Sequence, residues 1–387
     1  MNESADNLQR PAEQSPPASS PGDDAPKAQP LRVAWVAAPG TLERLERVLG
    51  PLATGLLDVP IELTVICPQD AQTAKLPSPP LEFVRYDQRR WLGVSRKTAE
   101  LLGGRLRKAN IQLIHALDAG AAGFARQLAR LAQTPCVVSV DRVGEGRKLG
   151  SLETPVVGAL AGSEAVRRDL LDNRKLPAGR IHRVRPGVHA AEWANCFSVP
   201  GRSVAVVACG DMDAFGPFGA VVNAFAELRS RNYDCAFFAI GEGKARRRLR
   251  KLCETLHLRG ALVFADPQRP SQLAGILKGA DICICPRSTR EVNMPGLLAM
   301  AAGICVMAGG AGASDFLIEG QTAMLFEPGN SAELAFKLAA LLGDPRAARS
   351  LADGGLAYLH EHHSPAGMVQ NVLDVYGWAL GEGAQGA

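Results

Sequence analysis

Short apolar strands alternate with helical segments along almost the whole chain, and this plan occurs twice. In the first half, β-branched and apolar runs such as LRVAWV (31–36) and IELTVIC (61–67) are separated by stretches with helical periodicity. The second half repeats the pattern with SVAVVACG (203–210), CAFFAIGEG (235–243) and DICICPR (281–287). Strands that alternate with helices form parallel sheets covered on both faces. The sequence therefore predicts an α/β protein with two Rossmann-like sheets.

The length of the chain agrees with two domains. Single hydrophobic cores stop growing near roughly 250–300 residues, and this chain has 387. The segment FSVPGRS (197–203) carries Pro and Gly between the two periodic regions and predicts the boundary. Residues 1–30 are rich in Pro, Ser, Ala, Asp and Gln, which is typical of a disordered tail. The predicted domains span residues 31–198 and 199–364, followed by a C-terminal helix over 365–387.

The pattern makes three further local predictions. Residues 41–57 are expected to form one helix. The basic segment KARRRLRKLCETLHL (244–258) is expected to form another. The run RIHRVRPGV (180–188) is expected to be the last strand of the first half.

Composition excludes several classes of protein. The nine Cys show no CxxC pair and no Cys/His spacing typical of a metal site, and most lie in apolar runs. Unpaired, scattered Cys favours a reducing compartment, so a cytoplasmic location is expected. No uninterrupted apolar stretch reaches the roughly 18 residues of a membrane span. A net charge of +4 does not call for nucleic acid as a partner.

Seven segments, in this order and at this spacing, resemble the family-4 type (group 1) glycosyltransferases of GT-B fold. They are GSEAVRRDLL (162–171), RPGVHAAEW (185–193), CGDMDAFGPFGAVVNAFAEL (209–228), FAIGEGKARRRLRKL (238–252), LKGADICICPR (277–287), GLLAMAAGICVMAGG (296–310) and LIEGQTAMLFEPGNSAELA (317–335). The resemblance implies two Rossmann-like domains that face each other across a cleft. It also implies that the last helix, with MVQNVLDVYGWAL (368–380), crosses back to the first domain.

The resemblance further implies an activity and a site. Such enzymes transfer a sugar, here expected to be a hexose, from a nucleoside-diphosphate sugar to an acceptor, usually with retention and without a metal or other cofactor. The second domain holds the donor and the first the acceptor. The expected catalytic residues are His115 and Glu291. The expected donor-binding residues are Gly210, Gly241, Gly243, Arg287, Arg290, Gly296 and Leu297.

The sequence also departs from the family pattern where the donor is bound. Asp211 and Gly216 stand at the positions of an Arg and a Lys that neutralise the donor diphosphate, and Leu298 stands where the second of two Glu belongs. Glu291 lies one residue beyond the position of the first Glu. A cation beside a diphosphate attracts it and an Asp repels it. Two hypotheses follow: an enzyme with a rewired donor site, or a pseudo-glycosyltransferase that binds or scaffolds without turnover.

Several sequence features are open to two interpretations. Gly241 and Gly243 fit either a nucleotide-binding loop or a plain tight turn. The basic run at 244–251 fits a solvated helix face, or contact with an anionic acceptor or with the inner face of a membrane. The sequence HEHH (360–363) resembles a metal cluster but favours a solvated run. Asp141 and Arg142 follow a strand and fit either the edge of the cleft or a simple pair with each other. The acceptor is left open as a glycan, a lipid or a small molecule.

Overall fold

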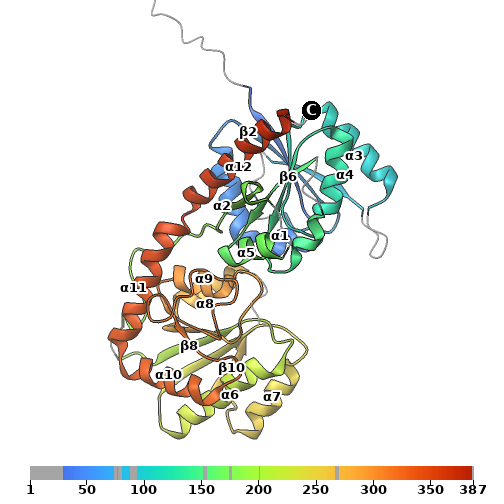
Figure 1. Ribbon diagram of the computed structural model, residues 1–387. Coiled ribbons are helices and arrows are strands. Elements are labelled where there is room, and N and C mark those ends of the chain that lie inside the picture. The colour runs from blue at the N-terminus through green and yellow to red at the C-terminus, as the bar shows by residue number, and fades with distance from the viewer. Residues whose placement is uncertain are drawn as a thin grey trace, which may run out of the picture.

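The structure is a computed structural model and describes residues 29–385, except 74–75, 77–80, 88–93, 151–154, 174–176, 200 and 266–269. The tail predicted over residues 1–30 lies outside the described residues, apart from its last two. The chain forms two α/β lobes, each built on a parallel sheet (Figure 1). This is the predicted pair of Rossmann-like domains.

The first sheet has seven parallel strands in the order β3-β2-β1-β4-β5-β6-β7. The strands are β1 (Leu31–Val36), β2 (Ile61–Pro68), β3 (Glu82–Tyr86), β4 (Leu113–Ala116), β5 (Cys136–Val140), β6 (Val156–Ala161) and β7 (Ile181–Arg183). The helices are α1 (Thr41–Arg44), α2 (Glu46–Leu57), α3 (Arg96–Lys108), α4 (Ala122–Ala132) and α5 (Glu164–Asp172). The strand order reverses between β1 and β4, where Val36 lies beside both Ile66 and Ala116.

The second sheet has six parallel strands in the order β10-β9-β8-β11-β12-β13. The strands are β8 (Val204–Cys209), β9 (Cys235–Ile240), β10 (Leu262–Ala265), β11 (Ile282–Cys285), β12 (Cys305–Ala308) and β13 (Met324–Leu325). The helices are α6 (Phe215–Ser230), α7 (Arg246–Thr255), α8 (Pro270–Lys278), α9 (Met294–Ala301), α10 (Ser331–Gly343) and α11 (Pro345–His362). This order reverses between β8 and β11. Ligands of such sheets bind beyond the carboxyl ends of the strands at this switch point.

The last helix, α12 (Pro365–Gln385), belongs to the core of the first lobe although it follows the second. Helices α11 and α12 run along one side of the molecule, and α12 reaches α2 in the first lobe (Figure 1). Side chains alternate across β1, so Trp35 points to the face that α12 covers. Its Nε1 donates to Tyr376 Oη at 2.9 Å. At Gly55 of α2, an added Cβ would lie 2.5 Å from Val369 Cγ2, so glycine permits the close approach of the two helices.

The structure corrects three local predictions. The helix expected over 41–57 is divided at Leu45, whose ψ of 6° departs from helical values. The helix expected over 244–258 spans only Arg246–Thr255, and beyond its end His257 has a left-handed φ of 54°. The last strand of the first half ends at Arg183. Further along, Pro186 has no amide hydrogen and Val188 donates to His363 O at 2.8 Å instead of to a strand.

Among the described residues, no helix combines the length and the apolar character needed to cross a bilayer.

Candidate functional site

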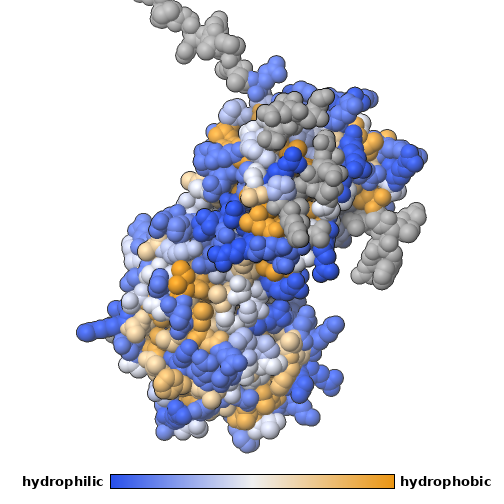
Figure 2. Space-filling view, viewed as in Figure 1, coloured by the Kyte–Doolittle hydropathy of each residue, from blue (hydrophilic) through white to orange (hydrophobic). Residues whose placement is uncertain are grey.

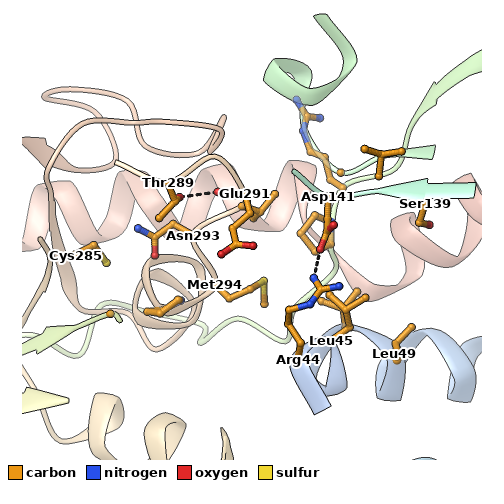
Figure 3. A pocket seen from close by; sticks show the side chains of 18 of the residues that line it. Arg44, Leu45, Leu49, Ser139, Asp141, Cys285, Thr289, Glu291, Asn293 and Met294 are labelled. Atoms are coloured by element: carbon orange, nitrogen blue, oxygen red, sulfur yellow. Dashed lines mark hydrogen bonds and ion pairs between the residues drawn. The ribbon is translucent and has the colours of Figure 1, made fainter. Parts of the chain in front are cut away.

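One cavity of about 440 Å³ lies between the carboxyl edges of the two sheets. From the first lobe it is lined by α1, α2 and the ends of β4, β5 and β6. From the second lobe it is lined by the ends of β8, β9 and β11 and by the start of α9 (Figure 3). Small-molecule sites have volumes of roughly 300–1,000 Å³, and this cavity is in that range.

An ion pair occupies the switch point of the second sheet. Asp211 follows β8 and Arg287 follows β11. The two guanidinium nitrogens of Arg287 contact the two carboxylate oxygens of Asp211 at 2.9 and 3.1 Å. Both residues line the cavity, and both side chains are about two-fifths exposed, at 39% and 42%. Asp211 stands at the position of the family's arginine. It pairs with Arg287, the residue that was expected to bind the donor phosphates.

A second set of charges lies at the switch point of the first sheet. Asp118 follows β4, and Arg44 at the end of α1 contacts it at 3.0 Å. Arg44 also pairs with Asp141, which follows β5 (Figure 3). Burial raises the pKa of the Asp141 carboxyl, and the Arg44 guanidinium opposes that rise. Of the two interpretations of Asp141 and Arg142, the structure supports the edge of the cleft, because Asp141 pairs with Arg44 and Arg142 with Glu291.

The two lobes meet through Arg142 and Glu291. Arg142 Nη2 and Nε lie 2.5 and 3.2 Å from Glu291 Oε2. The backbone also forms an antiparallel bridge here, in which Val143 N donates to Arg290 O at 2.7 Å. On the face drawn in Figure 2, hydrophilic residues form a band where the lobes meet, which is typical of an interface between domains. Glu291 lines the cavity, but its carboxylate is already paired.

Arg290 lies at this junction rather than in the wall of the cavity as far as the described residues define it. A Cβ added to Gly144 of the first lobe would be 2.2 Å from Arg290 Nη2. The Arg290 side chain therefore packs against the first lobe, and this geometry does not support the expectation that it binds donor phosphate.

The glycines predicted to bind the donor bring two loops together. A Cβ on Gly241 would lie 1.9 Å from Gly210 O, and a Cβ on Gly243 would lie 2.2 Å from Met212 C. Both glycines have a φ near 155°. The loops are joined further by a hydrogen bond from Met212 N to Glu242 O at 2.7 Å. Packing between loops thus requires both glycines. Gly210 and Gly241 line the cavity, and Gly243 is not among its described lining residues.

The start of α9 carries its own cap. Asn293 Oδ1 accepts from Gly296 N at 3.0 Å, and Asn293 O accepts from Leu297 N at 2.9 Å. The backbone amides of Gly296 and Leu297, two of the residues expected to bind the donor, are therefore engaged within the protein. Leu298 packs against the core. Asn293 was not among the residues predicted from the sequence, although Asn followed by Pro295 at the first helical turn is a recognised start signal.

His115 forms part of a buried hydrogen-bonded chain. Its Nδ1 lies 2.8 Å from Tyr376 Oη and its Nε2 lies 2.8 Å from Ser139 Oγ. The residue is 2% exposed, and burial lowers its pKa to about 3. The imidazole is therefore neutral and both nitrogens have protein partners. This geometry does not support a catalytic role and instead makes His115 a link between β4, β5 and α12.

Two of the three histidines of the HEHH segment contact backbone carbonyls, and His362 lies beside Glu361. His363 Nδ1 lies 2.8 Å from Pro186 O, and His360 Nε2 lies 3.1 Å from Ala191 O. Within the part of the chain that the structure describes, no group of three or more His, Cys, Asp or Glu side chains is placed to hold a metal ion.

Comparison with known proteins agrees with the two-lobed fold. The family model described as "Glycosyl transferases group 1" matches residues 204–344, and that described as "Glycosyltransferase Family 4" matches residues 45–192. Among solved structures, a glycosyltransferase from Rickettsia africae has a TM-score of 0.72 at 17% identity, covering 91% of this chain and 99% of its own. The Anabaena protein HepE in complex with UDP has a TM-score of 0.71 at 14% identity, covering 90% and 100%.

Curated relatives match over shorter stretches. A D-inositol 3-phosphate glycosyltransferase of Nocardia farcinica is 28% identical over 214 residues, which is 53% of this chain and 47% of that protein. A protein of the same name from Acidothermus cellulolyticus is 29% identical over 136 residues, covering 35% and 30%. The matched region thus spans less than half the length of these relatives.

Two Rossmann-like domains with a cavity between their carboxyl edges define the GT-B class. The two family matches fall on the two lobes in turn, and the chain belongs to the group 1, family 4 glycosyltransferases.

Proposed function

We propose that this protein transfers a hexose from a nucleoside-diphosphate sugar to an acceptor hydroxyl, with retention at the anomeric carbon and without a bound metal. The observation that carries this proposal is the convergence of both switch points on one cavity, with Arg287 in its wall. Membership of the glycosyltransferase family supports it. UDP is the first donor nucleotide to test, because the structural relative HepE was solved with UDP and with UDP-glucose.

Arg287 is the residue proposed to receive the donor diphosphate. As the sugar leaves, negative charge grows on the diphosphate oxygens, and a guanidinium stabilises it through two parallel hydrogen bonds. Arg287 already makes such a two-point contact with Asp211. The pair is partly exposed, so the diphosphate can exchange with the Asp211 carboxylate at modest cost. Arg287 would then pair with Asp211 in the empty site and with the diphosphate in the occupied site.

Two further features support a cytoplasmic location and peripheral contact with an anionic surface. All nine cysteines are buried and free, as in a reducing compartment. Arg247, Arg248, Arg250 and Lys251 of α7 are exposed. A basic helix face of this kind binds anionic membrane surfaces peripherally.

A second candidate is a binding or scaffolding protein without turnover. It is favoured because the groups expected to bind the donor already have partners within the protein. Arg287 pairs with Asp211, Glu291 pairs with Arg142, and Asn293 caps α9. A ligand would have to displace internal partners at each of these points.

Calorimetric titration with UDP, GDP, ADP and their sugar conjugates tests the proposal. We expect micromolar affinity for one nucleotide, weakened about tenfold or more in Arg287→Ala and kept in Arg259→Ala, whose exposed side chain pairs with Glu254 at a distance from the cavity. Turnover is then followed as nucleoside diphosphate released from the bound donor, with the anomeric configuration of the product read by NMR. Nucleotide binding without turnover favours the second candidate. Absence of binding at millimolar concentration would exclude a donor-dependent reaction.

A further inference from the structure

Three charged side chains face the cavity from opposite lobes. Arg44 and Asp141 belong to the first lobe and Glu291 to the second, and all three line the cavity (Figure 3). Their side chains are 39%, 23% and 35% exposed. The leucines behind them, such as Leu49 and Leu52, are almost fully buried and belong to the packed core of the first lobe. The space that a ligand can enter therefore lies beside the charged groups.

The position of Arg44 is fixed from the first lobe. Its Nη2 lies 3.0 Å from Asp118 Oδ2. Asp118 is itself buried, and its carboxylate also accepts from the Thr41 hydroxyl and from Ala121 N, the latter at 2.9 Å. Arg44 Nη1 pairs with Asp141. A guanidinium held at two points loses little freedom when a further group binds to it, so Arg44 and Asp141 form a preorganised pair.

This pair keeps hydrogen-bonding capacity for a ligand. A guanidinium carries a fork of N–H donors, and Arg44 uses one donor on each of two nitrogens. A carboxylate has more acceptor positions than Asp141 fills with Arg44 and its own backbone amide. A hydroxyl group both donates and accepts. Two adjacent hydroxyls can therefore bind side by side, one accepting from Arg44 and the other donating to Asp141.

The charge around Arg44 disfavours an anionic ligand. The carboxylates of Asp118, Asp141 and Glu291 all act on the Arg44 guanidinium. Glu291 also pairs with Arg142, which adds a second cation. Three carboxylates against two guanidinium groups leave an excess of one negative charge.

The other charged residues in the described wall of the cavity do not change this balance. Asp211 and Arg287 neutralise each other. Arg185 lies 3.7 Å from Asp315, and their side chains are only 17% and 15% exposed. The first-lobe side of the cavity therefore has no cation in excess for a phosphate group.

We propose that the Arg44–Asp141 pair binds adjacent hydroxyl groups of an uncharged polyol acceptor, in preference to a phosphorylated acceptor or an alcohol with a hydrocarbon tail. This inference rests on the proposed function only for the role of the polyol as acceptor. A phosphate group at this point is repelled by the excess of carboxylates. A hydrocarbon tail would remove water from charged groups without replacing its hydrogen bonds.

Ligand-observed NMR titration of the full chain without nucleotide compares three probes that have the same number of carbon atoms. D-mannitol offers adjacent hydroxyls, D-mannitol 1-phosphate adds a charge to them, and n-hexanol keeps a single hydroxyl. D-mannitol should bind about tenfold or more tightly than either of the others, because hydrogen bonds to charged groups contribute about 1.5–3 kcal/mol. The preference over the phosphate should shrink at high salt. Tighter binding of either other probe, or equal binding of all three, would overturn the inference.

Variants locate the binding. Asp141→Asn removes one charge while keeping the shape, so D-mannitol affinity should fall about tenfold and the preference over D-mannitol 1-phosphate should narrow. Arg44→Lys keeps the charge but loses the guanidinium fork, so D-mannitol affinity should fall while the preference stays. The matched control is Asp172→Asn, at an exposed residue of α5 outside the described wall of the cavity, which should bind as the wild type does. Unchanged D-mannitol affinity in both Asp141→Asn and Arg44→Lys would contradict the proposal.

The result can be separated from that of the donor site, because nucleotide binding is measured independently. If UDP binds and D-mannitol does not, this inference fails and the proposed function stands with another acceptor. If D-mannitol binds as expected and no nucleotide binds, the hydroxyl-binding pair is supported and the donor-dependent reaction is excluded.

Discussion

Asp211 and Arg287 form a two-point ion pair across the switch point of the second sheet, with the shorter contact at 2.9 Å. The strands that carry them, β8 and β11, are neighbours in the sheet although the residues are 76 positions apart in the chain. Under the proposed function, Asp211 is an internal anion at the place where the donor diphosphate would bind, and an incoming nucleotide would compete with it for the Arg287 guanidinium.

The first prediction concerns this competition. Arg287→Ala should weaken UDP binding about tenfold or more, because a hydrogen bond to a charged group contributes about 1.5–3 kcal/mol. Asp211→Asn should strengthen it, because the competing charge is removed. Calorimetric titration measures both, with Arg259→Ala as the control. Weaker UDP binding in Asp211→Asn would show that the carboxylate assists binding rather than competing.

The second prediction concerns the contact between the loops after β8 and β9. Gly241→Ala should lower the free energy of unfolding by about 3 kcal/mol or more, because the new Cβ would overlap Gly210 O and the φ of 155° is strained for alanine. Urea denaturation measures the loss. Gly275→Ala on the exposed side of α8 meets nothing within 4 Å and should be neutral or stabilising. Equal stability of the two variants would contradict the packing argument.

The third prediction concerns the junction of the lobes. The Arg142–Glu291 pair is about one-third to one-half exposed, so it should contribute no more than about 1 kcal/mol to closure. Glu291→Gln should therefore lower the ratio of molecules whose lobes are in contact to molecules whose lobes have separated, by up to about fivefold at low salt. Solution scattering would show this as a larger radius of gyration. The difference should vanish at high salt. Glu100→Gln, in an exposed pair with Arg96, is the control and should not change the radius.

The fourth prediction concerns pH. Burial lowers the pKa of His115 to about 3 and that of His363 to about 4, against about 6.5 in an unfolded chain. Between these values the unfolded state binds protons that the folded state does not. Stability is therefore complete above about pH 6.5 and falls as the pH drops towards 4, by about 1.4 kcal/mol per pH unit for each histidine.

Urea denaturation between about pH 7 and about pH 5 measures this slope. His363→Gln should be less stable at neutral pH but should show a shallower dependence on pH. His189→Gln, at an exposed histidine, should keep the slope of the wild type. A slope in His363→Gln as steep as that of the wild type would contradict the assignment.

The fold was predictable because its signal is local. Alternation along single strands and helices predicts two parallel sheets, and both are confirmed. The breaks inside elements were harder to predict. The interruption at Leu45 leaves the apolar periodicity of residues 41–57 intact, so nothing in the pattern marks it.

The site was less predictable because its partners are distant in the chain. The sequence placed His115 at a strand end near the cleft, but Tyr376, which occupies its Nδ1, comes 261 residues later. Likewise, Arg44 and Asp118 were overlooked. Asp118 directly after a strand was a usable signal, whereas its contact with Arg44 depends on how α1 packs. Charges at strand ends predict where a site lies, and only the fold shows which charges neutralise one another.

The return of α12 to the first lobe has a consequence for biosynthesis. The indole nitrogen of Trp35 has its hydrogen-bond partner in Tyr376, a residue 341 positions later in the chain. The helix that carries Tyr376 also covers this face of β1. A ribosome releases the chain from its N-terminus onward, so the strands of the first lobe emerge before the second lobe, yet the first lobe lacks part of its core until α12 has left the exit tunnel. The second lobe, whose core residues all lie between Val188 and Leu359, can close earlier. In this protein the lobe that is made first is therefore the one that finishes folding last.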